Sequence, residues 1–204
     1  MAASINIQVI TSAFLTVDIL GGKEGDMSEK NIFYDDGSIR IRSMLEEDAK
    51  TIFDTQASYG WHPSMDTYNN YYSEQESHKR LVFVAEYEGK MAGYCTLILN
   101  PTGGPWEGLG YPEINDLLVF FHVHKMGIGN KLLDIVEQEA AKITDTVYLA
   151  VGVHSGYGPA QRMYVKRGYN FDGSGAWYQG KQLGQYEHFG QSEYERITKV
   201  FREG

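Results

Sequence analysis

The chain has 204 residues, of which 42% are hydrophobic and 22% are charged, as is usual for one globular domain with a sizeable core. Its formal charge is −9, from 18 Lys and Arg against 27 Asp and Glu. A protein whose main partner is nucleic acid needs an excess of Lys and Arg to neutralise phosphates, so no nucleic-acid partner is expected. The acidic balance instead suits a cationic partner.

The chain contains one cysteine, Cys95, in an apolar and strand-like context. A lone cysteine excludes an internal disulfide and leaves a cysteine-based metal site without partners. We expect Cys95 to be a small buried side chain of a protein in a reducing, cytoplasmic compartment. His154 has no metal-ligand spacing with any other histidine, so no metal is predicted.

Residues 4–20 are apolar enough to raise the question of targeting. They contain no Lys or Arg and are shorter than the ~20 residues that a membrane span needs. We therefore expect no membrane association, and we interpret residues 1–36 as an N-terminal arm or appended segment before one domain over residues 37–204. Met1 and Met27 are both candidates for the native start.

Hydrophobic periodicity predicts strands and helices along the remaining chain. Apolar alternation and apolar runs bounded by turn residues predict strands over residues 39–42, 81–87, 91–99, 114–121, 146–153 and 194–201. Apolar residues at helical spacing predict helices that begin near Ser43, Ser64, Gly127 and Gly158. The first of these carries a capping box formed by Ser43 and Glu46. The element order implies an α/β (α+β) fold with a mixed, mostly antiparallel central sheet flanked by helices.

Residues 119–133 read VFFHVHKMGIGNKLL and join a strand to a helix through a turn with Gly127 and Gly129. Backbone N–H groups at such a turn point outward, and the helix adds the positive end of its dipole, so together they form a pocket for phosphate. A P-loop motif is absent, and a dinucleotide fingerprint would need a third glycine where Leu132 stands. Alone, the turn is equally compatible with a plain strand-to-helix connection.

Two motifs together resemble the GNAT (general control-related N-acetyltransferase) superfamily. In this family a strand ending in Val leads through a [QR]-x-x-G-x-[GA] turn into a helix with paired leucines, matched here by Val119, Gly127, Gly129, Leu132 and Leu133. The second motif, A-x-x-x-Y-x-x-x-G-[FY], is matched by Ala160, Tyr164, Gly168 and Tyr169. The resemblance covers roughly residues 39–178 and implies the GNAT acyltransferase fold. The sequence departs from the family at three positions: His124 for Gln or Arg, Phe121 for Pro, and Tyr157 for Asn.

The resemblance implies acetyl-CoA as co-substrate and an amine acceptor that attacks its thioester directly. The pyrophosphate is expected on backbone N–H groups of residues 125–130, and the pantetheine arm along the preceding strand end. The cofactor-binding residues expected on this basis are Leu118, Val119, His124, Lys125, Met126, Gly127, Ile128, Gly129, Asn130, Lys131 and Ala160. Lys125 and Lys131 are equally compatible with solvated lysines at a helix start. A homodimer is frequent in the family and compatible with this sequence.

The resemblance also implies an acid and a base. Tyr164 matches the tyrosine that serves as the acid in many family members, and it is also compatible with a packing aromatic. Glu113 is the favoured base and Asp116 the next, because both lie on the strand whose end meets the thioester. Each carboxylate is also compatible with a structural role, and a bound water could relay the proton instead.

Aromatic residues predict the acceptor side. They gather in the segment that borders the acceptor in the family and in a late loop, as Tyr59, Trp61, His62, Tyr68, Tyr71 and Tyr72 and as Trp177, Tyr178, Tyr186 and Phe189. Aromatic walls in an acidic field suit a cationic amine, of a small molecule or of a peptide, although tyrosine-rich helices are often packing elements. Two alternatives to an enzyme are a non-catalytic acyl-CoA-binding or sensing module and an interaction domain that has lost the pocket.

Overall fold

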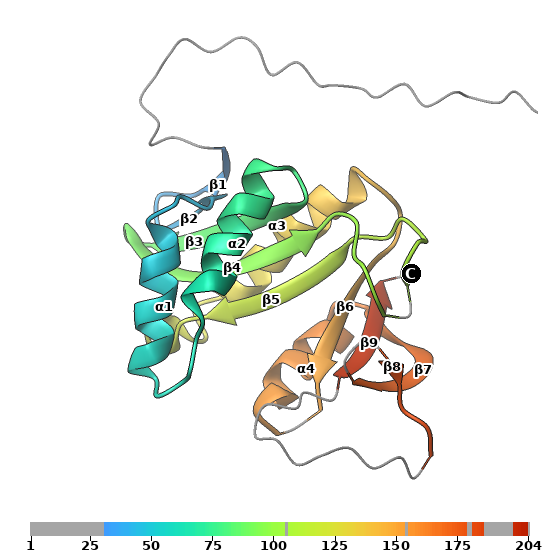
Figure 1. The fold of residues 1–204 in the computed structure, drawn as a ribbon. Helices are drawn as coiled ribbons and strands as arrows, with labels where there is room; N and C mark the ends of the chain where they lie inside the picture. The colour runs from blue at the N-terminus through green and yellow to red at the C-terminus, as the bar shows by residue number, and fades with distance from the viewer. Residues whose placement is uncertain (1–30, 105, 154, 179–180, 186–197, 204) are drawn as a thin grey trace, which may run out of the picture.

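The computed structural model describes residues 31–203 except 105, 154, 179–180 and 186–197. Within these residues, nine strands form one sheet in the order β1-β2-β3-β4-β5-β6-β9-β7-β8 (Figure 1). The strands are β1 (Ile32–Asp35), β2 (Ile39–Ser43), β3 (Arg80–Tyr87), β4 (Lys90–Ile98), β5 (Glu113–Val119), β6 (Val147–Gly152), β7 (Asn170–Tyr178), β8 (Lys181–Gln182) and β9 (Thr198–Glu203). The helices are α1 (Asp48–Ser58), α2 (Met65–Glu76), α3 (Ile128–Ala141) and α4 (Gly158–Lys166), with short 3-10 helices η1 (Phe121–Val123) and η2 (Ser155–Tyr157).

The predicted mixed, mostly antiparallel sheet flanked by helices is confirmed. Only β5 and β6 pair in parallel, and the other neighbouring pairs within the described residues are antiparallel. Figure 1 shows α1 and α2 across one face of the sheet and α3 behind the other face. Side chains alternate along β3, so Val82 and Val84 pack with α1 and α2, whereas Phe83 and Ala85 pack in the core that contains α3. The sheet is therefore covered on both faces where it carries the site.

The first helix begins later than the capping box predicted. Ser43 is the last residue of β2, where it pairs with Phe83, and α1 begins at Asp48. The Asp48 carboxylate accepts the N–H of Leu45 at 2.7 Å and pairs with Arg42 at 2.6 Å. The prediction was wrong because strand pairing across the sheet holds Ser43, and local spacing carries no information about that pairing.

The helix expected from Ser64 is confirmed, since α2 has Ser64 as its N-cap residue. The strand expected over residues 114–121 ends early, at Val119, because the chain turns into η1 at Phe121. Strand β1 was not expected, and it joins the described end of the predicted N-terminal arm to the sheet. Residues 1–30, with the segment 4–20 and Met27, lie outside the described residues.

The last expected strand, residues 194–201, is described only from residue 198, where β9 begins. Among the helices that the structure describes, none has the length and apolar character to cross a membrane.

Candidate active site

The sheet opens between its two parallel strands. β5 and β6 pair only at Glu113 with Tyr148 and at Ile114 with Leu149, and beyond these pairs the strands diverge (Figure 1). Among the described residues, the β6-facing edge of β5 after Ile114 therefore lacks a neighbouring strand. An unpaired strand edge offers backbone N–H and C=O groups to an extended ligand.

A β-bulge bends β5 at this opening. The register with β4 shifts so that Asp116 and Leu117 together stand opposite Cys95, and Asp116 has a φ of 50°. A bulge of this kind bends its strand and increases the local twist. Gly93 on β4 permits the close approach that follows, because a Cβ at this position would collide with the backbone of Leu118.

The turn after β5 presents backbone donors at one end of the opening. Lys125 and Gly127 both have left-handed backbone conformations, with φ of 67° and 83°. The first backbone bond of α3 runs from the Lys131 N–H to the Gly127 carbonyl at 3.0 Å, so the N–H groups of residues 128–130 have no acceptor within the helix. Gly127 is exposed and Gly129 is half-buried, which leaves this end of α3 open to an anion.

Two side chains that were expected to hold phosphate have contacts within the protein. The Nε2 atom of His124 lies 2.9 Å from the Val119 carbonyl oxygen, and because that oxygen can only accept, Nε2 must carry the hydrogen. The Lys131 ammonium lies 4.2 Å from the centre of the Tyr34 ring and 3.8 Å from Asp134. The backbone of the turn is thus better placed than these side chains to bind an anion.

Asp116 and two tyrosines from other elements form a hydrogen-bonded cluster beside the bulge. Its Oδ2 oxygen accepts the hydroxyl of Tyr94 at 2.7 Å and the hydroxyl of Tyr71 at 3.1 Å. Gln56 on α1 donates to the Tyr94 oxygen at 3.1 Å. Burial, with a further contribution from the Asp116 charge, raises the pKa of both Tyr71 and Tyr94, so both phenols remain donors. Asp116 itself is exposed.

Glu113 lies where β5 and β6 are still paired. Its carboxylate accepts the Asn115 amide and the Tyr148 hydroxyl, each at 3.3 Å. Burial raises the pKa of Glu113, and the two hydrogen bonds and the charge of Arg80 partly oppose that rise. A carboxylate with a raised pKa is a stronger base than an ordinary surface glutamate.

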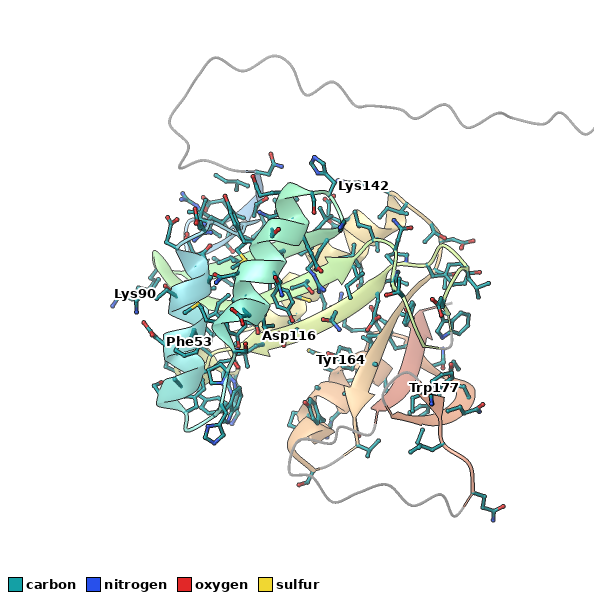
Figure 2. All side chains as sticks on the ribbon, viewed as in Figure 1. Phe53, Lys90, Asp116, Lys142, Tyr164 and Trp177 are labelled. Carbon is teal, nitrogen blue, oxygen red and sulfur yellow. The ribbon has the colours of Figure 1, made fainter. Side chains whose placement is uncertain are left out.

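Tyr164 on α4 faces the same region from the other side of the opening. Figure 2 shows Asp116 on β5 and Tyr164 below it, toward α4. The Tyr164 side chain is 6% exposed, and its ring meets the Tyr169 ring edge-on at 5.7 Å. Burial raises the pKa of Tyr164, so its phenol keeps its proton. Ala160, one turn earlier on α4, packs half-buried against the core, and Cys95 is fully buried as predicted.

The predicted aromatic residues of the acceptor side have different packing partners in the structure. Tyr68 and Tyr71 pack edge-on at 6.1 Å, and Tyr68 also meets Tyr94 at 6.3 Å. Tyr59 stacks on Phe121 at 4.1 Å, and its hydroxyl accepts the Phe121 N–H at 3.1 Å. The loop after α1 is thereby joined to η1, directly before the turn with Gly127.

The late aromatic group is only partly described. Trp177 lies on β7, and its indole N–H donates to the Ser174 hydroxyl at 2.7 Å (Figure 2). Tyr186 and Phe189 lie outside the described residues, as does His154.

Sequence reasoning missed Tyr94, Gln56 and Arg80 as members of the site. Tyr94 sits within a segment that indicates an ordinary buried strand, Arg80 stands directly before another such segment, and Gln56 sits within an ordinary helix. The missing signal was the bulge at Asp116, which no local pattern indicates.

Residues 45–169 match the family model described as the acetyltransferase (GNAT) family, which is more than half of the chain. The chain belongs to the GNAT acetyltransferase family. The resemblance to the GNAT superfamily that two sequence motifs indicated is confirmed. No curated protein matches the sequence significantly.

Solved GNAT structures of low sequence identity share the fold. An acetyltransferase from Salmonella typhimurium that modifies the N-terminal serine of ribosomal protein L7/L12 is 10% identical with a TM-score of 0.62, over 84% of this chain and 98% of that chain. The protein yncA from Salmonella typhimurium, solved with its cofactor acetyl-CoA, is 17% identical with a TM-score of 0.58, over 81% and 92%. Arabidopsis thaliana Naa50, in complex with the bisubstrate analogue CoA-Ac-MVNAL, is 17% identical with a TM-score of 0.56, over 82% and 99%.

Proposed function

We propose that this GNAT chain transfers an acetyl group from acetyl-CoA to a primary amine of a small molecule or a peptide, by direct attack of the amine on the thioester. The observation that carries the proposal is the opening between β5 and β6. Outward N–H groups of residues 128–130 lie at one end of it, and Asp116 and Tyr164 lie on its two sides. This combination offers donors for a diphosphate, an edge for an extended chain and groups that move protons.

The chain's own groups fit acetyl-CoA at this opening. The turn at residues 125–130, with the N–H groups of 128–130 at the start of α3, suits the pyrophosphate, and the unpaired edge of β5 at Leu118 and Val119 suits the amides of the pantetheine arm. Met126 and Lys125 are exposed beside the same turn. When bound, acetyl-CoA supplies a thioester carbonyl as the acyl donor.

Tyr164 is proposed as the acid. Its raised pKa keeps the phenol protonated at neutral pH, so it can donate that proton to a departing thiolate. Its position on α4, across the opening from β5, supports this role.

Two carboxylates support removal of a proton from the acceptor ammonium. We assign Glu113 as the base, because burial raises its pKa and strengthens its affinity for a proton. Asp116 is exposed at the bulge, and two phenols hold its Oδ2 oxygen, so we propose that it attracts and orients the ammonium. A water molecule would then relay the proton from the amine to Glu113.

The acceptor is proposed more broadly than the donor. The L7/L12-modifying enzyme and the Naa50 complex concern protein N-termini by their descriptions, which supports peptide amines as candidates. The exposed Asp116 carboxylate, beside the half-buried Tyr71, equally suits a small cationic amine.

Thiol release from acetyl-CoA over a panel of peptide N-termini, lysine peptides and small amines tests the proposal. We expect release that depends on at least one acceptor class. Binding of acetyl-CoA by calorimetry without thiol release for any acceptor would support the non-catalytic binding module instead. Absence of binding would contradict both functions.

The turn itself is tested with a matched pair of glycines. Gly127 and Gly89 have similar φ values of 83° and 73°, and an added Cβ would meet nothing within 4 Å at either position. Gly127→Asp places a negative charge at the proposed phosphate site, so we expect the Kd for CoA to rise about tenfold or more. Gly89→Asp introduces the same strain and charge in the β3–β4 hairpin and should leave the Kd unchanged. Equal effects of the two changes would contradict the assignment.

A further inference from the structure

Arg80 is a cation buried behind both carboxylates of the candidate site. Its side chain is 9% exposed, and its Nε atom pairs with the half-exposed Glu74 carboxylate at 2.6 Å. Its Nη1 atom points inward, donating to the Thr96 hydroxyl at 2.7 Å and to the Asn115 side-chain oxygen at 3.3 Å. A salt bridge to Glu74 alone would not require these two hydrogen bonds from Nη1. Burying a guanidinium costs free energy unless its N–H groups find acceptors.

The first inward connection leads through Asn115 to Glu113. Arg80 has donors and no acceptor, so the Asn115 oxygen must face Arg80 and the Asn115 amide nitrogen must face the other way. That nitrogen donates to Glu113 at 3.3 Å. The Thr96 hydroxyl accepts from Arg80 and donates to the Asn115 backbone carbonyl at 2.9 Å, which holds Asn115 from a second side. Arg80 thus fixes the orientation of the Asn115 amide, so that its NH2 group, and not its oxygen, faces the Glu113 carboxylate.

The second connection leads through Tyr71 to Asp116. The Arg80 guanidinium carbon lies 4.4 Å from the centre of the Tyr71 ring. A cation over the ring face makes the phenol more acidic, and it opposes the rise in the Tyr71 pKa that burial and Asp116 cause. A more acidic phenol is a stronger donor, and this hydroxyl donates to the Asp116 carboxylate at 3.1 Å.

We propose that Arg80 is a positioning residue for the reaction: it orients Glu113 through the Asn115 amide and Asp116 through the Tyr71 phenol, from a place behind the sheet opening. A role in catalysis rests on the proposed function, but the effect of Arg80 on the Glu113 carboxylate can be tested in the protein without ligand. The other groups that face Glu113 are Tyr148 on β6, which donates to it, and Glu107, whose charge acts on Tyr148.

The test follows the Glu113 carboxyl by carbon NMR of the whole protein as pH is changed, with the signal assigned through Glu113→Gln. Arg80→Met removes the cation and the constraint on Asn115, so the pKa of Glu113 should rise by about half a unit or more. Arg80→Lys keeps the charge and should restore most of that shift. Asn115→Leu, which retains Arg80 and its pair with Glu74, should give part of the rise and keeps the test valid if Arg80→Met folds poorly.

Arg42→Met is the matched control. Arg42 is also an arginine of low exposure, 12%, with two carboxylate partners, but these are Asp48 at the start of α1 and Glu86 on β3, and β3 and β4 separate its strand β2 from β5. It should leave the Glu113 titration unchanged. An unshifted Glu113 in both Arg80→Met and Asn115→Leu, or an equal shift in Arg42→Met, overturns the inference.

The same variants connect the inference to catalysis. The acid limb of the kcat/KM profile should move to higher pH in Arg80→Met and return in Arg80→Lys, in step with the NMR titration. If the wild type is active and the acid limb of the Arg80→Met profile lies at the same pH as that of the wild type, the positioning role is overturned. Absence of thiol release from the wild type would overturn the proposed function instead, whatever the titration shows.

Discussion

Two regions at the sheet opening are built in different ways. The backbone side, formed by the turn after β5 and the start of α3 at one end of the opening, offers mainly backbone N–H groups from residues that are neighbours in the sequence. The side-chain side, formed by α1, α2 and the bulge of β5, offers groups such as Gln56, Tyr71 and Asp116, which come from distant segments. A backbone site depends on φ and ψ values and on glycines, whereas a side-chain site depends on how the sheet aligns its strands.

This difference explains why the donor is easier to propose than the acceptor. A diphosphate needs a row of N–H groups, and many sequences can supply that row if the glycine spacing is kept. An acceptor meets particular side chains, so its identity varies with residues that no motif contains. Substitutions on the backbone side should therefore affect donor binding mainly by changing the backbone conformation or the local charge. Substitutions on the side-chain side should act on the acceptor by removing individual hydroxyl or carboxylate groups.

The largest expected effect comes from the phenol that α4 contributes. Tyr164→Phe should lower kcat by about 10²–10⁴-fold, because that is the usual contribution of a positioned acid. The control is Tyr169→Phe, which removes a hydroxyl that donates to Glu137 at 3.0 Å and whose ring adjoins Tyr164. Steady-state rates that fall less than tenfold in Tyr164→Phe, or equally in both variants, would assign Tyr164 to packing.

The next effect concerns the proposed base. Glu113 acts when deprotonated and its pKa is raised, so kcat/KM should fall as pH decreases through a value above the ordinary glutamate pKa of about 4.3. Glu113→Gln should remove this acid limb and lower kcat/KM at neutral pH by about 10²-fold. A pH–rate profile over the acid range measures both.

The control for the base is Glu139→Gln on α3, which breaks a 2.6 Å pair with Lys142. It should leave the profile unchanged. If the acid limb persists in Glu113→Gln, the base lies elsewhere, and Asp116→Asn then decides whether the bulge carboxylate has that role.

The smallest expected effect is a change in CoA binding, and it compares two lysines on the backbone side. The Lys131 ammonium lies over the Tyr34 ring and near Asp134, so Lys131→Met should change the Kd for CoA less than about threefold. Lys125→Met, in the turn itself, should weaken binding more. Calorimetry at low ionic strength compares the two, and a tenfold loss in Lys131→Met would show that this ammonium turns toward the phosphates.

Most elements of the fold were predicted from the sequence. The helix from Ser64 and the helix after Gly127 were predicted because turn residues and apolar spacing act over a few residues. The helix start at Ser43 was wrong because Ser43 pairs with Phe83, forty residues away, and local spacing carries no information about that pairing. Strand β1 was missed although its partner is local, since it forms a hairpin with β2 around the turn at residues 35–38.

The sequence by itself determined the family and the GNAT fold class, because both follow from short spacings of glycine, leucine and tyrosine. The same spacings predict a phosphate site at the turn before α3. Only the tertiary structure decided that β5 bulges at Asp116 and separates from β6. It also decided that Tyr71, Tyr94 and Arg80 converge behind that bulge. These contacts depend on strand register and close packing across the sheet, which the whole chain settles together and no single segment encodes.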